Sequence, residues 1–340
     1  MTQETIVNKK KGLSSQLFLI IIIAVYCVIV SIVNPEFLRA NTLFDLVKSA
    51  APTMVVAVGL MIVMISGGID VSFTAVAIFG GYVATTFLMN SGSDNMFVAF
   101  LISCGIGLVL GIINALLIHY SGMEPFIITL ATQGLFQGFL LTFVGTKNIG
   151  SMDIPKAITE FGNAKIFTVT DEYGSQNGLS IFLIFVIIVI AVTWFILHKT
   201  MLGRSVFALG CSKEAARRAG FNILKTHLFI YGYMGVLAGI MGMMYIAGIN
   251  ACNPVTLVGD ELSVIGAVVI GGAKVSGGQG TLSGTILGVI LMYLFNTTLI
   301  FLGLSSSWNN LFLGCVLIVS LIVTSYRERI INRKLFIFTE

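Results

Sequence analysis

The amino-acid sequence predicts an all-α membrane protein that crosses the bilayer about ten times. Hydrophobic residues make up 56% of the 340 residues and charged residues only 10%, whereas a soluble domain carries roughly 25% charged residues. The apolar residues also gather in runs of membrane-crossing length, since a spanning helix needs about 20 of them. Glycine, with 37 residues, suits helices that pack closely in lipid.

The predicted spans form one transmembrane domain over residues 1–340. The first apolar run follows three lysines, as in a signal peptide, but no A-x-A-like cleavage site follows it, so it is expected to remain as a helix. The eighth run is short and ends in glycines. The expected spans are 15–33, 50–66, 73–90, 96–118, 125–146, 179–198, 227–250, 260–273, 281–303 and 309–326.

The basic residues orient these spans. With the N-terminus inside, most of the 19 lysine and arginine residues fall on inner segments, as the positive-inside rule requires. Both ends are then cytoplasmic, with an inner segment at 199–226 between spans six and seven and an inner tail at 327–340. The longest outer segment, 147–178, has no long apolar run and is expected to be an extracytoplasmic loop with structure of its own.

Two glycine-containing stretches resemble each other. "LMIVMISGGIDVSFTAVAIFGGYV" (60–83) and "IGAVVIGGAKVSGGQGTLSGTILGVI" (265–290) each run from an apolar helix through a GG pair and polar residues into a second apolar helix. Transporters often place broken helices in paired positions, because the freed backbone groups line a cavity. The alternative is that glycine-rich turns simply recur in membrane proteins.

The inner segment predicts a short helix with clear ends. Ser212 can accept a hydrogen bond from a first-turn amide, and Glu214 lies in the positive first turn. Arg217 and Arg218 lie in the negative last turn, and Gly220 suits the left-handed position after it. A helix of about two turns is marginal alone. Its alanines, at 215, 216 and 219, offer a smooth docking face, although an ordinary basic loop is the alternative.

No motif for covalent chemistry is present. "GGAKVSGGQG" lacks the G-x-x-x-x-G-K-[ST] pattern of a phosphate-binding loop, and the three histidines have no ligand spacing around them. The five cysteines are scattered, with no C-x-x-C pair, which argues against disulfides or a metal site. The net charge of +4 is small and clustered, which argues against nucleic-acid binding.

The segment "GRSVFALGCSKEAARRAGFNILKTH" resembles the cytoplasmic coupling segment of ABC importer permeases of the ribose and simple-sugar type, in the branched-chain amino acid/ribose-type family. "SGGIDVS" (66–72) and "GDELSVIGAVVIGGAKVSGGQGTLSGTILG" (259–288) also resemble family motifs, in the same order. Departures occur at Lys213, Phe221, Ser263, Phe73 and Thr74. The coupling-segment matches are Arg204, Ala208, Gly210, Ala215, Ala216 and Gly220.

The resemblance implies a permease subunit of the bacterial inner membrane. An ABC ATPase would use ATP and Mg and would dock on this chain, which itself binds no cofactor. A solute-binding protein would deliver a small neutral solute, most simply a monosaccharide, with a nucleoside or a sugar-like signal molecule as alternatives. A second permease chain, identical or paralogous, would complete the pathway. The expected ATPase-coupling residues are Arg204, Ser212, Glu214, Ala215, Ala216, Arg217 and Gly220.

Polar residues near or inside the spans are candidates for the solute pathway. Asp70 either caps the next helix, accepting from the amides of Phe73 or Thr74, or lines the pathway. Asp260 and Glu261 either favour a helix N-terminus or contact the binding protein. Amides and hydroxyls inside spans either pass a sugar or bond neighbouring helices; they are Asn114, Thr129, Gln133, Gln137, Asn296 and Thr297.

An ion-coupled secondary transporter is the competing function. It predicts paired acids or bases deep inside the spans. Apart from Asp70, the acids of this sequence fall near span ends or in loops, which favours the ABC permease.

Overall fold

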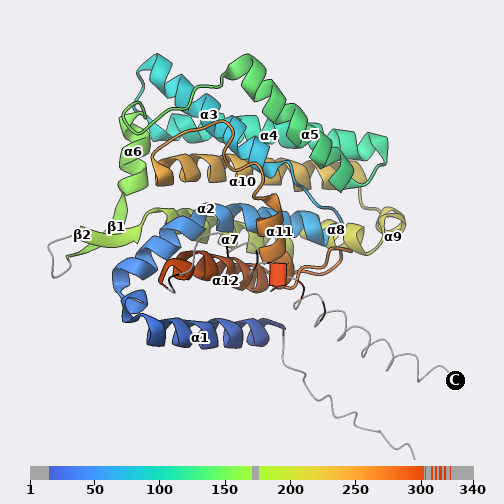
Figure 1. The fold of residues 1–340 in the computed structure, drawn as a ribbon. Coiled ribbons are helices and arrows are strands. Elements are labelled where there is room, and N and C mark those ends of the chain that lie inside the picture. The colour runs from blue at the N-terminus through green and yellow to red at the C-terminus, as the bar shows by residue number, and fades with distance from the viewer. Residues whose placement is uncertain are drawn as a thin grey trace, which may run out of the picture.

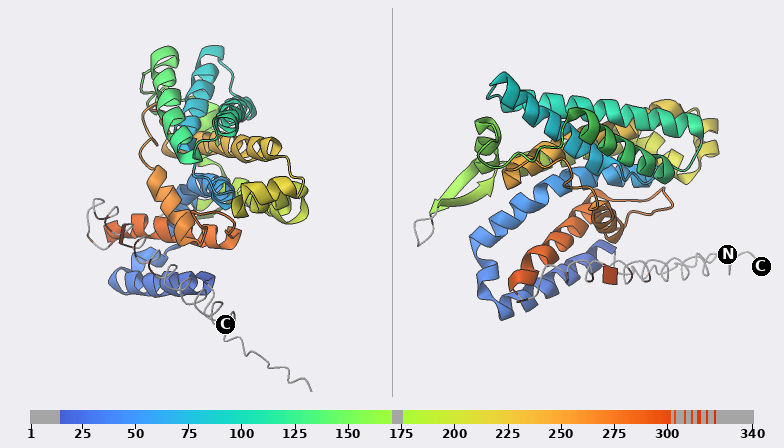
Figure 2. Two further views of the ribbon diagram at one scale, coloured as in Figure 1. Left: turned by 90° about the vertical axis from the view of Figure 1, so that its right-hand side faces the viewer. Right: turned by 45° about the horizontal axis from the view of Figure 1, so that its top comes forward.

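The computed structural model describes residues 15–170 and 176–301, together with the single positions 303, 308, 311, 314, 315, 318 and 322. Long helices lie roughly side by side, with a short hairpin at one end of the bundle and two short helices at the other (Figures 1 and 2). Eight described helices are long and apolar enough to cross a membrane. This confirms the predicted all-α polytopic class.

The first half of the chain, up to the hairpin, contains most of the spanning helices. Its elements are α1 (Ser15–Val33), the 3-10 turn η1 (Pro35–Leu38), α2 (Ala40–Ile65), α3 (Phe73–Ser91), α4 (Met96–Ser121), α5 (Pro125–Phe139), the π-helical turn η2 (Leu140–Val144) and α6 (Lys156–Asn163). The antiparallel hairpin consists of β1 (Lys165–Thr170) and β2 (Gln176–Ser180). The remaining helices are α7 (Phe182–Lys199), α8 (Met201–Cys211), α9 (Lys213–Arg218), α10 (Ile223–Ile249), α11 (Glu261–Ile270) and α12 (Leu282–Phe301).

The predicted spans match the described helices with two differences. The second span was expected from residue 50, but α2 begins at Ala40, because the polar stretch before its apolar core also adopts helical structure. The eighth span was expected over 260–273, but α11 has only 10 residues. At about 1.5 Å per residue it reaches only half of a hydrocarbon core of roughly 30 Å. The tenth expected span and the expected inner tail lie outside the described residues, apart from a few isolated positions.

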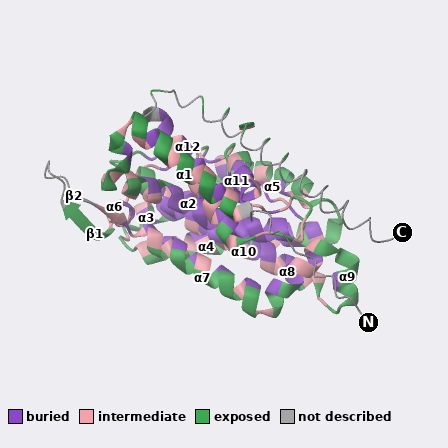
Figure 3. Cartoon of the chain, turned by 90° about the horizontal axis from the view of Figure 1, so that it is seen from below, coloured by how far each residue is buried: buried purple, intermediate pink, exposed green. Residues whose placement is uncertain are grey.

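The core of the bundle is formed by α2, α3 and α10, which are mostly buried, while α1, α4, α5 and α7 expose apolar faces (Figure 3). Glycines bring α4 and α10 together: a Cβ added to Gly107 would lie 2.1 Å from the carbonyl oxygen of Gly235. Such contact suits helices that pack in lipid through small residues. The exposed apolar faces are those expected of a chain surrounded by lipid.

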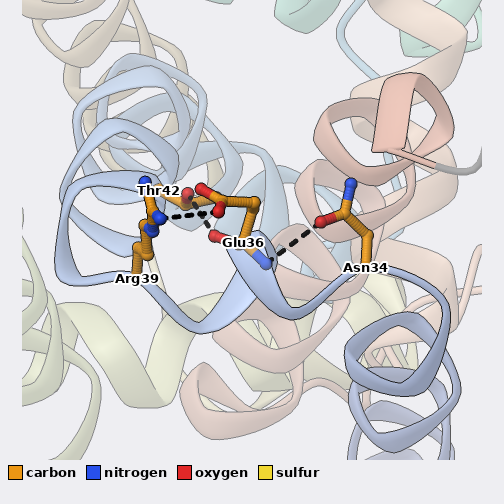
Figure 4. A network of polar contacts seen from close by, with 4 residues as sticks. All are labelled: Asn34, Glu36, Arg39 and Thr42. Atoms are coloured by element: carbon orange, nitrogen blue, oxygen red, sulfur yellow. Dashed lines mark hydrogen bonds and ion pairs between the residues drawn. The ribbon is translucent and has the colours of Figure 1, made fainter.

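A polar turn reverses the chain between α1 and α2 (Figure 4). The Oδ1 atom of Asn34 accepts a hydrogen bond from the amide of Glu36 at 3.0 Å. The Glu36 carboxylate pairs with Arg39 at 2.6 Å, and its carbonyl oxygen accepts from the Thr42 hydroxyl at 3.0 Å. The two hydrogen bonds use freed backbone groups of Glu36, and the turn lies at the hairpin end of the molecule (Figure 1).

The predicted outer segment, 147–178, has structure of its own, as expected. It contains α6 and most of the hairpin, and an isolated bridge joins Ile149 to Cys252 at 2.9 Å in both directions. This segment and the pair α8–α9 lie at opposite ends of the bundle (Figure 1).

Candidate functional site

The two glycine-containing stretches that resemble each other in sequence form similar turns. The α2–α3 link (residues 66–72) and the α11–α12 link (residues 271–281) both follow a helix that ends in a left-handed glycine, Gly67 with φ +86° and Gly272 with φ +93°. In each, an amide donates to a carbonyl five residues back, which is the Schellman pattern: Gly68 to Val63 at 3.1 Å, and Ala273 to Val268 at 3.2 Å.

The two links meet each other and α8. The amide of Gly278 donates to the carbonyl oxygen of Ile65 at 2.8 Å. A Cβ added to Gly210 would lie 1.8 Å from that same oxygen and 2.6 Å from the amide nitrogen of Gly278, and one added to Gly277 would lie 2.8 Å from the Cα of Gly67. Backbone therefore packs on backbone where α8 reaches the bundle.

The α2–α3 link carries a buried polar network. The Asp70 carboxylate accepts from both the amide and the hydroxyl of Ser72, at 2.8 and 2.7 Å. The Nδ2 atom of Asn114 donates to the Ser72 hydroxyl at 2.8 Å. The expected cap, in which Asp70 accepts from the amides of Phe73 or Thr74, is therefore wrong, because the Asp70 carboxylate accepts from Ser72 instead. Two of the candidate pathway residues, Asp70 and Asn114, are joined through Ser72, which is not among the residues predicted from the sequence.

Thr129 of α5 anchors the same link from the other side. Its hydroxyl donates to the carbonyl oxygen of Ile69 at 3.1 Å and accepts from the amide of Val71 at 3.3 Å. Burial raises the pKa of the Asp70 carboxyl to about 6, and the hydrogen bonds from Ser72 oppose that rise. Through these hydrogen bonds Asn114 and Thr129 join the link to α4 and α5, and the place of Asp70, Asn114 and Thr129 on a solute pathway stays a prediction.

Glu261 joins three helices at the beginning of α11. Its Oε1 atom accepts from the hydroxyl of Thr74 and from the side-chain amide of Gln133, and both carboxylate oxygens accept from the amide of Gly259 at 3.0 Å. The side chain is only 6% exposed. The expected contact of Glu261 with an external binding protein is therefore wrong, because the carboxylate is buried and its bonds face α3 and α5. Asp260 is exposed, but it faces a cavity within the bundle.

That cavity has a volume of about 260 Å³ and lies between α2, α3, α10, α11 and α12. Thr53, at the middle of α2, shares a hydrogen bond of 2.6 Å with the Tyr293 hydroxyl of α12 on its wall. Other polar side chains on the wall are Thr74, Tyr245, Asp260, Ser263 and Asn296. The cavity thus lies near mid-height of the spanning helices, at the N-terminal end of the short helix α11.

The remaining candidate pathway residues lie apart from this cavity. Gln137 is half-buried on α5 and has no hydrogen bond to another described residue. The Thr297 hydroxyl donates to the carbonyl oxygen of Tyr293 within its own helix, at 2.8 Å. Of the candidates selected from sequence, Asn296 and Asp260 line the cavity, and Gln133 reaches its edge through Glu261.

The short helix of the inner segment is present as α9. Ser212 accepts from the amide of Ala215 at 3.3 Å, and Gly220 has a φ of +86°. Glu214 and Arg218 lie 3.9 Å apart on the exposed surface. Ala216, however, is 2% exposed. Its side chain is covered by the rest of the protein, so the expected place of Ala216 on an outward docking face is wrong. The other expected coupling residues are exposed: Arg204, Ser212, Glu214, Ala215, Arg217 and Gly220.

Four cavity residues are not among those predicted from the sequence: Thr53, Tyr245, Ser263 and Tyr293. Tyrosine and serine are ordinary in membrane helices, so only the period of their helices could have placed them on one face. The period of a single helix does not predict which faces of five separate helices come together around one cavity.

The comparisons with known proteins identify the class. A family model described as the permease component of branched-chain amino acid transport systems matches residues 42–321. The chain is 31% identical over 317 residues to the ribose import permease protein of Bacillus subtilis, covering 93% of each chain. It is 28% identical over 333 residues to the ribose import permease protein of Escherichia coli K12, covering 96% of this chain and all of that one. It is 30% identical over 308 residues to the autoinducer 2 import system permease protein of Photorhabdus temperata, covering 89% of each.

These matches, with the eight apolar helices, define a membrane-spanning permease component of the bacterial inner membrane. The chain belongs to the family of branched-chain amino acid transport system permease components. No solved structure matches it.

Proposed function

We propose that this chain is the permease subunit of an ABC importer that carries a small neutral solute, most simply a monosaccharide, into the cell. The observation that carries the proposal is the similarity to ribose import permeases from two bacteria over nearly the whole length of both chains. The similarity to an autoinducer 2 permease favours a sugar-like signal molecule as the second candidate solute.

The proposed orientation places the α8–α9 end in the cytoplasm. Exposed basic residues support it: Arg204, Arg217, Arg218 and Lys225 lie on α8, α9 and the first turn of α10. The chain begins α1 at the same end, since Gln16 donates to the hydroxyl of Ser283, at the start of α12, at 2.8 Å. Both termini are cytoplasmic in this proposal, which counts ten crossings: the eight long helices, the segment 250–260 together with the short α11, and 309–326.

The helix α9 is the proposed docking element for the ATPase. It is bounded by its own cap and exposes charge on most of its surface, while buried Ala216 fixes it to the chain. The preceding helix, α8, contacts both links, so a displacement of α9 would be transmitted to the bundle. ATP and Mg belong to the partner, because this sequence contains no phosphate-binding motif. The solute-binding protein would approach the opposite, hairpin end, and a second permease chain, identical or paralogous, would complete the complex.

Uptake measurements test this proposal. The chain is expressed with its own ATPase and binding protein in bacteria that lack a ribose permease, and entry of radiolabelled D-ribose and D-galactose is followed. We expect uptake that requires the ATPase and survives ionophores. Uptake that persists without the ATPase, or that stops when ion gradients are dissipated in cells with normal ATP, would instead establish an ion-coupled transporter.

A further inference from the structure

Three polar side chains on the wall of the cavity have unused hydrogen-bonding capacity. Asp260, Ser263 and Asn296 all line it, and among the described residues none of their side chains makes a hydrogen bond or an ion pair. A carboxylate accepts up to four hydrogen bonds, and an amide both donates and accepts. Asp260 is exposed, and Ser263 and Asn296 are half-buried, so a ligand that enters the cavity can reach all three groups.

Glu261, the acid next to Asp260 in the sequence, has a structural role at the beginning of α11 and serves as a comparison. Glu261 is buried, and its oxygens accept from Thr74, Gln133 and Gly259. Asp260, one residue earlier, faces the cavity without such partners. Two adjacent acids thus have different environments, and only Asp260 is left to bind something else.

The backbone around the cavity is of the kind that lines solute sites. The segment 250–260 is irregular, with positive φ at Asn250, Leu257 and Gly259, and it lies beside α11, which is too short to span. Non-helical backbone at membrane depth is tolerated where it lines a cavity, and transporters build midplane sites at the ends of broken helices. The wall also carries the rings of Tyr245 and Tyr293, which can pack on the apolar face of a sugar ring.

We propose that this cavity is a solute subsite, in which Asp260, Ser263 and Asn296 bind neighbouring hydroxyl groups of a neutral polyol. The inference rests on the proposed function and specifies its solute class. The carboxylate of Asp260 accepts from two hydroxyls, while Asn296 donates to one oxygen and accepts from another. Drug-sized ligands occupy pockets of roughly 300–1,000 Å³, so a cavity of about 260 Å³ suits a smaller molecule of monosaccharide size.

The same wall rejects amino acids. None of the described residues that line the cavity is lysine, arginine or histidine. The ammonium of a zwitterionic amino acid could pair with Asp260, but its carboxylate would have no cation on this wall to pair with, which is unfavourable at low dielectric. This chain should therefore prefer polyols, although its family is described by branched-chain amino acid transport.

Thiol protection in the assembled permease–ATPase complex tests the subsite. Ser263→Cys is placed in a background whose five native cysteines are replaced by serine or alanine, and a small methanethiosulfonate reagent labels it. D-ribose, D-galactose and myo-inositol serve as polyol probes, and L-leucine and sodium chloride as comparisons. We expect at least one polyol to slow labelling several-fold, and leucine and sodium to have no effect.

Second variants connect the protection to the named side chains. Adding Asp260→Asn or Asn296→Ala should weaken the apparent affinity for the protecting polyol roughly 10- to 100-fold, the range for a lost hydrogen bond to a charged or polar group. Protection is measured as the ratio of the labelling rates with and without polyol for each variant, because Asp260 lies near the labelled thiol and alters its reactivity. Unchanged co-purification with the ATPase shows that the variants fold. Asp94→Asn, on the exposed α3–α4 turn, is the matched control and should leave protection intact.

The outcomes separate this inference from the proposed function. If the complete importer takes up a polyol that does not slow labelling at Ser263→Cys, the subsite is wrong and the function stands. The subsite is also wrong if protection survives both Asp260→Asn and Asn296→Ala, or if sodium alone protects. If the complete importer takes up leucine and none of the three polyols, the proposed sugar transport itself fails.

Discussion

Replacing Gly210 by alanine should disrupt the joint between α8 and the two links. The added Cβ would lie 1.8 Å from the carbonyl oxygen of Ile65 and 2.6 Å from the amide nitrogen of Gly278. Both neighbours are backbone, so neither can move aside by changing a rotamer. They are also bonded to each other at 2.8 Å, and any shift that makes room for the methyl group separates them.

The expected cost follows from these contacts. Overpacking of a tight site costs about 1–3 kcal/mol, and a buried backbone hydrogen bond left unmade costs about 1–3 kcal/mol more. The better helix propensity of alanine returns up to about 1 kcal/mol. The net destabilisation is therefore about 1–6 kcal/mol, concentrated at the joint.

The assay is thermal stability of the detergent-solubilised protein, measured by size-exclusion chromatography after heating, together with solute uptake. Gly105→Ala is the matched control, since Gly105 also lies inside a helix and its added Cβ would meet no atom within 4 Å. We expect Gly210→Ala to lower the melting temperature and reduce uptake, and Gly105→Ala to leave both at or above the parent level. Equal stability and uptake for the two variants would refute the backbone contact between α8 and the links.

Two further perturbations probe the ends of this arrangement. Arg217→Glu should abolish co-purification with the ATPase and leave the amount of membrane-inserted protein unchanged, because the side chain is exposed. Lys225→Glu, on the first turn of α10, is the control for charge reversal alone. Equal loss of the ATPase in both variants would argue against a specific docking helix. Thr129→Val removes a donor and an acceptor from the α2–α3 link and should lower stability by about 1–3 kcal/mol. In contrast, Thr86→Val removes a hydroxyl that has no partner among the described residues and should be nearly neutral; a neutral Thr129→Val in the same melting assay would contradict the anchoring role.

Local features of the sequence were predictable because their physical causes are local. The spans follow from apolar runs of sufficient length, and α9 follows from the cap at Ser212 and the glycine at 220. Even the similarity of the two GG stretches proved informative, since the helices before them end in the same hydrogen-bond pattern. The sequence does not predict α8 as a helix of its own within the segment 199–226, because 11 residues are too few for a span and its glycines weaken a helical pattern.

The site depends on pairs that are far apart in the chain. Thr74 and Glu261 are separated by 187 positions, and Thr53 and Tyr293 by 240. Which face of each helix turns inward decides whether Glu261 meets a binding protein or a neighbouring helix. The sequence indicates only that both acids lie at a helix N-terminus. Whether Glu261 is buried and Asp260 faces the cavity depends on the path of segment 250–260, and no short-range pattern in the sequence specifies that path.

The arrangement also limits how motion can pass between the two ends. The helix α9 follows α8 after a single residue, α8 touches both links at Gly210, and the second link ends the short helix α11 whose other end bears Asp260. Side chains at a joint can absorb a displacement by changing rotamers, but Gly67, Gly210 and Gly277 offer none, so a shift of α8 must move the backbone of the links. Because α11 is only 10 residues long, it can transmit that movement as one rigid unit over about 15 Å. The cavity and α9, the proposed docking helix, are therefore connected through a joint at which backbone packs on backbone, and such a joint suits the proposed drive from the cytoplasm.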